Sequence, residues 1–334
     1  MDINIMTREQ VPVTPTHHLP VSLARITVPH ARPTYSVGDF GALLLLEQTA
    51  PGLSILYKTY YIRHTTSLYE TTGTATFYLC MPVNRALRCQ QQGLSRLRIP
   101  EGQFNIFYAN PVHTQYWFEK GRKYQVYELH YTAAMLEPLR AAFPIVDEFL
   151  LKTELAFSGQ LGTTHTHITP EMLRLLEQIC TCPFTGVIKD LYLHSLAARL
   201  LLLAVTRLSL VKTPAMDLKL QPYELSRLRE AWEYLVQHLD QPGTLTELSQ
   251  VVGLNSFKLK RGFKQLYGIT IFEFLLEARM EKAKRLLRES DMSVHAVAIS
   301  VGYRNISSFT VAFKKKYGIL PSETQKIGRG AWPG

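Results

Sequence analysis

The spacing of apolar residues from Leu43 to about Tyr131 is that of β-strands. Short runs rich in Tyr, Phe, Ile and Val alternate with Gly, Pro and Asn turn signals, and the clearest runs are Ser54–Ile62, Ala75–Met81, Phe104–Tyr108 and Tyr124–Tyr131. Such runs predict strands because branched and aromatic side chains fit a pleated, half-buried surface. Many short strands with turns between them favour a small antiparallel barrel or sandwich.

The spacing then becomes helical. Met135–Phe143 and Ile145–Leu151 are predicted helices, and Thr169–Glu171 opens a longer helix with proline at its first position. Leucines lie around most of the circumference of a helix over Ile188–Leu210. We therefore expect that helix to be buried on several sides, in the domain core or against a second subunit.

Residues 248–268 and 297–318 are copies of one unit. The matched positions, at an offset of 49 before the turn and 50 after it, include Ser249 and Ala298, Gly253 and Gly302, Phe263 and Phe313, and Gly268 and Gly318. Each copy predicts a short helix, a small residue where helices approach closely, a glycine turn and a second helix ending at glycine. This is the helix-turn-helix layout, and we expect its matched phenylalanines to lie in the core.

One continuous helix, Thr270–Glu289, is predicted between the two copies. Twenty residues of α-helix span roughly 30 Å, and successive major grooves on one face of B-DNA lie ~34 Å apart. This spacing suits the placement of Ser256–Lys264 and Asn305–Lys314 in neighbouring grooves. An all-helical bundle or a protein-binding module is the alternative, and the two registered copies favour DNA.

Charge is concentrated in the same region. The chain has a formal net charge of +10 and a pI of about 9.4, which suits a polyanionic partner. Residues 215–334 carry 18 Lys and Arg against 12 Asp and Glu, a net +6, whereas residues 1–214 carry 19 against 15, a net +4. The shorter segment is therefore denser in positive charge.

The second copy closely follows the signature of a known family. Its diagnostic residues are Ser293-Val294, Val297-Ala298, Val301-Gly302-Tyr303, Phe309, Phe313-Lys314-Lys315, Tyr317-Gly318 and Pro321-Ser322. The C-terminal third thus resembles the AraC/XylS family of transcription regulators. Phe257–Lys264, Gly268–Phe272 and Met172–Ala204 resemble a narrower branch, whose members respond to the siderophore pyochelin.

The resemblance implies which residues contact DNA, because the second helix of each unit enters the major groove in that family. In the first unit it implies base contacts from Phe257, Lys260 and Arg261 and a phosphate contact from Lys264. In the second unit the base-facing positions are Ile306, Ser307, Ser308 and Val311, with phosphate contacts from Arg304, Lys314 and Lys315. Val311 departs from the pattern, since arginine is common there, so the second unit is expected to read its half-site weakly.

The other candidate sites have fewer residues suited to binding a ligand or a metal. His113, Tyr116 and Trp117 are candidates to line a ligand pocket, with structural packing an equal alternative. Cys180 and Cys182 lack a second Cys/His pair at zinc-like spacing. His165 and His167 would need to lie on a strand to serve a cupin-type metal site, and the sequence around them is not strand-like. No metal site and no cofactor are therefore expected, and four cysteines are too few for a disulfide scaffold.

These observations predict an α+β protein with three parts. Residues 1–213 form a barrel-like or cupin-like ligand-sensing and dimerisation domain with appended helices, residues 214–221 a linker, and residues 222–334 an all-α DNA-binding domain with two helix-turn-helix units. The dimer is expected to form through helices such as Leu193–Leu208. The resemblance implies a ferric siderophore as the small-molecule effector.

The expected function is ligand-controlled transcription regulation by a cytoplasmic homodimer, with duplex DNA and RNA polymerase as partners. We find no catalytic motif, no signal peptide and no membrane span; the apolar stretch Leu196–Leu210 is interrupted by Arg199 and Arg207. Two alternatives stay open. One is a cupin-like metal-dependent enzyme with an accessory DNA-binding domain, and the other is an architectural DNA binder without a ligand.

Overall fold

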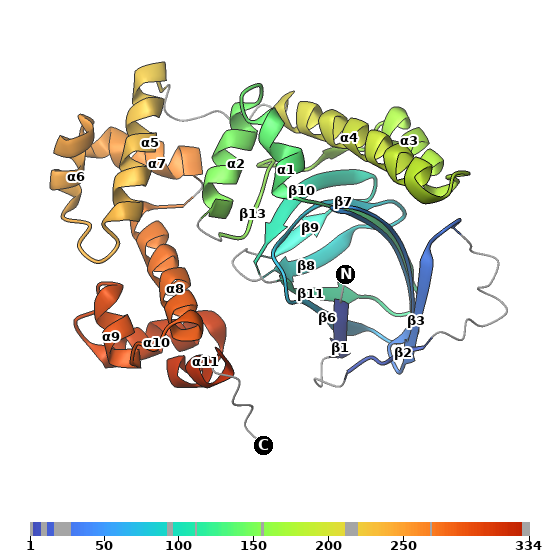
Figure 1. The fold of residues 1–334 in the computed structure, drawn as a ribbon, viewed down its shortest axis with the longest axis horizontal. Helices are drawn as coiled ribbons and strands as arrows, with labels where there is room; N and C mark the ends of the chain where they lie inside the picture. Colours follow the sequence, from blue (N-terminus) through green and yellow to red (C-terminus); the bar gives the residue numbers. More distant parts are fainter. Residues whose placement is uncertain are drawn as a thin grey trace. The chain divides into compact units, whose positions relative to one another are not determined.

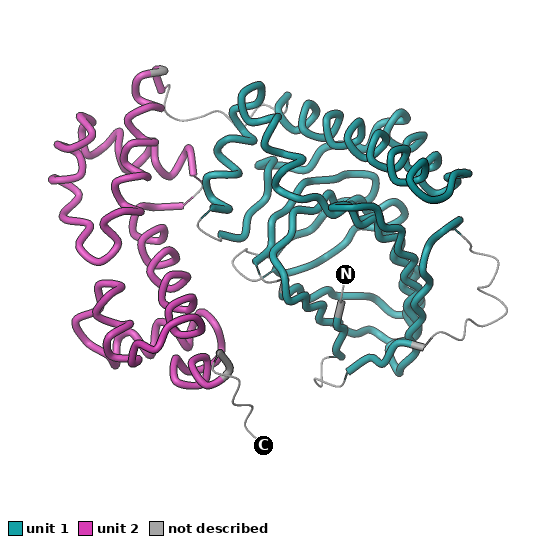
Figure 2. The backbone as a smooth tube through the Cα atoms, in the orientation of Figure 1, with its two compact units in different colours: residues 1–213 teal, residues 214–334 magenta. Residues whose placement is uncertain are grey.

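The computed structural model describes residues 3–7, 12–16, 28–91, 96–110, 112–154, 157–210, 220–267 and 269–328. Most of the predicted linker lies outside these residues. The chain divides into two compact units, residues 1–213 and 214–334 (Figure 2).

The strands of the first unit form two antiparallel sheets. The larger sheet has the order β13-β10-β7-β12-β5-β4-β3-β2, with β14 also paired to β10. Its strands are β2 (Pro15–Thr16), β3 (Arg32–Gly38), β4 (Gly41–Ala50), β5 (Leu53–Ile62), β7 (Thr76–Pro82), β10 (Gln103–Ala109), β12 (Lys123–Tyr131), β13 (Gly159–Gln160) and β14 (Thr166–His167). All four predicted strands lie in this sheet.

The smaller sheet has the order β1-β6-β11-β8-β9. Its strands are β1 (Ile3–Thr7), β6 (Thr66–Thr72), β8 (Leu87–Gln91), β9 (Leu97–Ile99) and β11 (Val112–Phe118). The prediction of a sheet-rich N-terminal domain is confirmed. Over the described residues, however, the strands form two open sheets and not the closed barrel that we expected, because each sheet ends in strands paired on one side.

Helices cover one face of the larger sheet (Figure 1). They are α1 (Ala133–Leu136), the 3₁₀ helix η1 (Glu137–Leu139), α2 (Pro144–Glu154), α3 (Pro170–Cys180) and α4 (Gly186–Leu210). The predicted helix at Met135–Phe143 is shorter than expected, because Pro138 lacks the N–H that would continue it. Thr169 begins α3 as predicted, since its side chain accepts a hydrogen bond from the Met172 amide at 3.2 Å.

Strand alternation gives the larger sheet two buried faces. On β5, Leu53 and Ile55 face the helices, whereas Tyr60 and Ile62 face the smaller sheet. The first core contains residues of β7, β10, β12, α3 and α4, and the second contains residues of both sheets. The unit is therefore a sandwich with a helical layer on one side.

Helix α4 differs from its prediction in how it is buried. Leu193, Leu200 and Val205 lie fully inside the first core, whereas Val187 and Leu191 are 74% and 67% exposed. Only one face is covered within this unit, not several. With 25 residues, α4 is the one helix of the described residues that is long and apolar enough to cross a membrane. Its buried face is that of a core helix.

The second unit is all-helical. Its helices are α5 (Pro222–Gln237), α6 (Leu245–Val252), α7 (Ser256–Tyr267), α8 (Ile271–Glu289), α9 (Val294–Ser300), α10 (Ile306–Tyr317) and α11 (Pro321–Gly328). The pairs α6–α7 and α9–α10 are the two predicted helix-turn-helix units, and α8 is the predicted connecting helix (Figure 1). Thr270 caps α8 with a reciprocal pair of hydrogen bonds to Glu273. Gly268, which was predicted to end α7, lies outside the described residues.

Each helix-turn-helix unit has its own core. Phe263 and Phe313 are both fully buried, as predicted. Phe263 packs with Trp232 of α5, their ring centroids 6.0 Å apart, and Phe313 belongs to a cluster formed by α8, α9 and α10. These cores fix the second helix of each unit and determine which of its residues face solvent.

Candidate nucleic-acid interface and ligand site

The solvent face of α7 is a stripe of the four residues predicted to contact DNA in the first unit. Phe257, Lys260, Arg261 and Lys264 are all exposed, and their spacing of three, one and three residues aligns them along one side of the helix. Arg261 lies over the Phe257 ring, its guanidinium carbon 5.5 Å from the centroid. This stripe, the α7 stripe, combines three cations with one aromatic ring.

The neighbouring Lys258 has a different role. Its ammonium group contacts the Glu224 carboxylate on α5, whose side chain is only 1% exposed. Lys258 therefore joins α7 to α5 within the domain. The hydrogen bond to Lys258 is the main cause of the lowered pKa of Glu224.

The solvent face of α10 carries less charge at its N-terminal half. Ile306, Ser307, Ser308 and Val311 are all exposed, with Val311 at 69%. Asn305 caps the helix, because its side-chain oxygen accepts hydrogen bonds from the Ser307 and Ser308 amides at 2.7 and 3.2 Å.

Positive charge in the second unit lies at the two ends of this face. Arg304 precedes the cap and is exposed, as are Lys314 and Lys315 in the last turn. Lys316 contacts Glu277 and Glu281 of α8 at 2.7 and 3.0 Å, so it stabilises the domain. All eleven predicted DNA-contacting residues are therefore on the surface, and the cations at the ends suit phosphate contacts.

The two turns are built on glycines in left-handed conformation. Gly253 has φ +66° and open space where a Cβ would lie. Gly302 has φ +84°, and a Cβ there would come within 2.6 Å of the Asp240 carbonyl oxygen and 2.8 Å of an Arg279 nitrogen.

Helices α6 and α7 approach each other closely at two serines. The hydroxyls of Ser249 and Ser256 lie 3.4 Å apart. The small residue at Ser249 is thus explained by a close helix contact.

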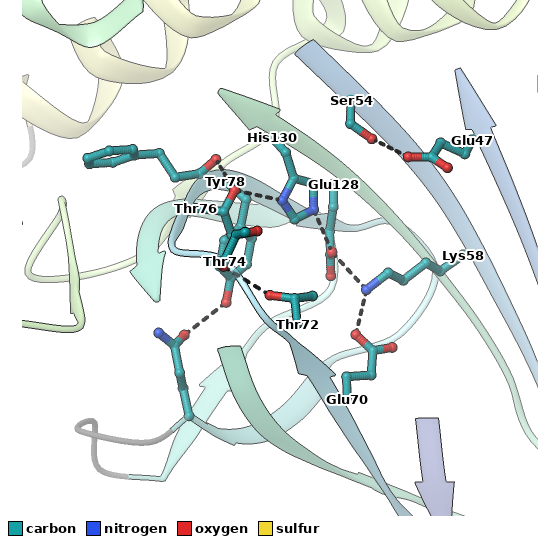
Figure 3. Close-up of polar contacts among 12 residues, drawn as sticks. Glu47, Ser54, Lys58, Glu70, Thr72, Thr74, Thr76, Tyr78, Glu128 and His130 are labelled. Atoms are coloured by element: carbon teal, nitrogen blue, oxygen red, sulfur yellow. Dashed lines mark hydrogen bonds and ion pairs between the residues drawn. The ribbon is translucent and has the colours of Figure 1, made fainter. Parts of the chain in front are cut away.

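The first unit holds a buried polar network that the sequence did not predict (Figure 3). Lys58 on β5 contacts Glu70 on β6 at 2.6 Å and Glu128 on β12 at 2.8 Å, and all three are about 97% buried. The Tyr60 hydroxyl donates to Glu70 at 2.5 Å, and His130 lies 3.3 Å from Glu128. Lys58 thus joins the two sheets through charged groups inside the sandwich.

Within this network, the pKa values of Glu128 and Lys58 shift toward their charged forms despite burial. Burial opposes ionisation of Glu128, but Lys58 and His130 outweigh it and lower the pKa of this carboxyl to about 2. Burial also opposes the charge on Lys58, and Glu128 and Glu70 together still raise its pKa. Removing one partner of such a buried group costs about 3–5 kcal/mol, because the remaining charge has no counterpart.

A cavity of about 540 Å³ lies at the end of strands β4, β5, β7 and β12. His130 and Thr76 are among its lining residues, and the Thr76 hydroxyl lies 3.1 Å from His130 Nδ1 (Figure 3). His130 therefore connects this cavity to Lys58 and the two carboxylates.

The three residues predicted to line a ligand pocket are separated by strand alternation. Tyr116 points into the sandwich core, whereas His113 is exposed and Trp117 lies on the outer face of the smaller sheet. Only Trp117 lines a second cavity, of about 500 Å³, together with Arg88, Arg96 and Arg98. The sequence signal for this second cavity was the pair Arg96 and Arg98, one just before β9 and one within it.

The remaining candidates do not form a metal site within the described residues. His167 lies on β14, a two-residue strand that the sequence did not predict, and His165 lies 3.4 Å from the Asn105 amide. Cys180 contacts the Tyr127 hydroxyl, and Cys182 is buried as a free thiol. Over the residues that the structure describes, no group of three or more His, Cys, Asp or Glu side chains is arranged so that it could hold a metal ion.

The chain combines a C-terminal unit of two helix-turn-helix units, each with an exposed second helix, with a separate N-terminal unit. Residues 248–327 match the model of a helix-turn-helix domain, and residues 40–220 match the model of the regulatory protein PchR N-terminal domain. The second match covers more than half of the 334 residues. The chain therefore belongs to the family of regulatory proteins that carry the PchR N-terminal domain.

Individual relatives agree with this family. Regulatory protein PchR of Pseudomonas aeruginosa is 38% identical over 123 residues, 37% of this chain and 42% of that protein. The arabinose operon regulatory protein of Escherichia coli is 32% identical over 118 residues, 35% of this chain and 40% of that protein. Each match spans less than half of the relative's length. The predicted resemblance to the AraC/XylS family and its narrower branch is confirmed.

Among solved structures, the C-terminal domain of AraT, a response regulator from Geobacillus stearothermophilus, is similar at 32% identity. The match covers 33% of this chain and 88% of that chain, with a TM-score of 0.29.

Proposed function

We propose that the protein is a ligand-responsive transcription regulator that binds specific duplex DNA sequences as a cytoplasmic homodimer. The observation that carries the proposal is the α7 stripe, exposed on the second helix of a helix-turn-helix unit. Arginine and lysine are the side chains that make bidentate contacts to guanine in the major groove. The protein acts by binding and not by catalysis, with RNA polymerase as the partner of the DNA-bound form.

The two reading helices have different tasks in this proposal. Lys260 and Arg261 read bases, Phe257 contacts a thymine methyl, and Lys264 contacts phosphate. On α10, Ile306 and Val311 make apolar base contacts, Ser307 and Ser308 make permissive hydrogen bonds, and Arg304, Lys314 and Lys315 contact phosphates. Helix α8, with 19 residues, is about 28 Å long, which suits neighbouring major grooves.

The test begins with the DNA sequences that the full-length protein selects from a random duplex library. Affinity for a selected duplex, measured by fluorescence anisotropy, should fall steeply with salt; about six neutralised phosphates give a log–log slope near −5. A Lys260→Ala/Arg261→Ala variant should lose the selected motif. Arg174→Ala removes an exposed charge on α3 and should keep it. A salt-insensitive complex, or no complex at low salt, would contradict the proposal.

The first unit is proposed to bind the effector. One cavity among its described residues, of about 540 Å³ beside His130, is within the usual range for small-molecule sites. The resemblance to the siderophore-responsive branch makes a ferric siderophore or related chelate the first effector to test. Titration with ferric chelates, read by tryptophan fluorescence and thermal shift, should show saturable binding. Tight binding of a sugar, with no binding of the chelates, would contradict this effector class.

The dimer is proposed to use the exposed face of α4. The residues first expected at the interface, within Leu193–Leu208, are largely buried in the domain's own core. The opposite face exposes Val187, Ile188, Leu191 and Leu202. Leu191→Glu should shift the sedimentation coefficient of the full-length protein from dimer to monomer, and Leu173→Glu on α3 is the matched control. A dimer that survives Leu191→Glu would place the interface elsewhere.

A further inference from the structure

The outer face of the smaller sheet carries a concentration of arginine around one tryptophan. Side chains alternate along a strand, so Trp117 on β11, Arg88 on β8 and Arg98 on β9 all point away from the sandwich core. The strand register places Trp117 directly opposite Arg88, and Arg88 directly opposite Arg98. The three residues therefore form one row across three neighbouring strands.

This row of residues is electrostatically unfavourable unless a negatively charged group lies beside it. Like charges directly opposite on paired strands repel each other. Arg96, which precedes β9, adds a third cation, and its guanidinium carbon lies 5.2 Å from the Trp117 ring centroid. The one carboxylate among the lining residues is Glu119, 3.3 Å from Arg88. Three cations against one anion leave the site two positive charges in excess.

Structural roles account for little of this arrangement. The Arg88–Glu119 pair is exposed, with both side chains more than half accessible, and such pairs contribute little to stability. Arg98 makes no hydrogen bond or ion pair with another side chain of the described residues. A guanidinium has five N–H donors, so Arg88 can hold Glu119 and still donate to a second acceptor.

The shape of the site indicates the size of what it binds. The residues line the hollow of about 500 Å³, with the indole of Trp117 beside the guanidinium groups. Planar guanidinium groups match a carboxylate through paired hydrogen bonds, and an indole face packs against a flat ring. A hollow of this volume accommodates a small molecule with both features.

We propose that this outer face is a binding site for a planar aromatic carboxylate. The carboxylate is held between Arg88 and Arg98, where it relieves the repulsion between them, and the ring packs against Trp117 beside Arg96. The inference does not depend on DNA binding, since none of these residues belongs to the helix-turn-helix units.

The test is calorimetric titration of the full-length protein with 1-naphthoate and with its neutral isostere, 1-naphthamide. Naphthoate should bind in the submillimolar range, and naphthamide at least tenfold more weakly because it lacks the charge. Inorganic phosphate, which lacks the ring, should also bind at least tenfold more weakly. Equal affinity for naphthoate and either of these two compounds, or no binding of naphthoate at millimolar concentration, would overturn the proposal.

Variants locate the site. Arg98→Ala and Trp117→Ala should each lower naphthoate affinity tenfold or more, whereas Arg174→Ala, an exposed arginine on α3, should leave it unchanged. Arg98→Lys should retain part of the affinity, since lysine keeps the positive charge but cannot form the paired hydrogen bonds of a guanidinium group. The same loss in Arg174→Ala would mean that the effect is one of net charge alone.

A nucleic-acid strand is the other anion that a basic, aromatic face attracts. A twelve-nucleotide oligothymidine provides that comparison. If it binds more tightly than naphthoate and loses its affinity in Arg98→Ala, this face belongs to single-stranded nucleic acid and the carboxylate assignment is wrong.

Discussion

The two helix-turn-helix units are copies in their cores and differ on their solvent faces. Phe263 and Phe313 occupy equivalent, fully buried positions. On the surface, α7 carries Lys260 and Arg261 in its middle, whereas α10 carries Val311 there and keeps its charges at the ends. The shared scaffold therefore fixes where each second helix is presented, whereas the exposed residues, proposed above to contact DNA, differ between the two units.

The turns of the two helix-turn-helix units also differ, in how closely other atoms pack around their glycines. Gly253 and Gly302 share a left-handed backbone, but only Gly302 faces packed atoms where a Cβ would lie. The second turn is therefore packed against Asp240, which lies between α5 and α6, and Arg279 of α8, whereas the first turn is open. A difference in surface residues is accompanied by a difference in how tightly each turn is packed.

The largest expected effect follows from these two glycines. Gly253→Ala should cost about 1–2 kcal/mol from the left-handed conformation alone. Gly302→Ala should cost about 1–3 kcal/mol more, because the methyl group meets backbone and guanidinium atoms. Hydrogen exchange of α7 and α10, measured by mass spectrometry, reports both losses. Equal losses in the two variants would show that the packing around Gly302 relaxes without cost.

The next effect concerns base recognition by α7. Arg261→Ala should remove contacts worth ~1–3 kcal/mol of discrimination and relax base preference in the half-site read by the first unit. Site selection from a random library gives the motif of each variant. An unchanged motif would show that a residue of the α7 stripe other than Arg261 recognises the bases.

A phosphate contact should behave differently. Lys314→Ala should weaken binding to a similar extent for all sequences and flatten the log–log salt slope by about one unit. Anisotropy titrations with a selected and an unrelated duplex measure both quantities. A sequence-dependent loss would show that Lys314 reads a base.

The smallest effect is expected at Val311. Val311→Ala should change specificity by less than about 1 kcal/mol, because it removes only part of an apolar contact with a thymine methyl. The comparison with Arg261→Ala is decisive. If Val311→Ala degrades the selected motif as badly, α7 is not the dominant reading helix.

The sequence was most informative where structure is local. The helices of the second unit follow from spacing, caps and turn glycines within a few residues of each other, and so α6 to α10 and the buried Phe263 and Phe313 were predictable. Helices α5 and α11 were not singled out, since neither belongs to the repeat. The residues of the α7 stripe were expected from the family resemblance, and the helical period explains why they share one side of the helix.

The first unit was harder to predict because its contacts connect distant strands. Four of its strands were predicted, but the pairing of Lys58 with Glu70 and Glu128 depends on which strands are neighbours. A lysine within an aromatic strand was the one available signal. Alternation also separates Tyr116 from Trp117, neighbours in sequence that were predicted to share a pocket.

The buried Lys58 restricts how the strands of the first unit pair during folding. A slip of β5 by one residue would turn Lys58 toward the helix-covered face, among Leu53, Ile55 and their apolar neighbours. There it would be a charge without a counterpart. Only the observed register gives the ammonium group two carboxylates from two different strands. We infer that this lysine disfavours misaligned strand pairings during folding. This contribution to folding accuracy is separate from any contribution that the lysine makes to the stability of the folded domain.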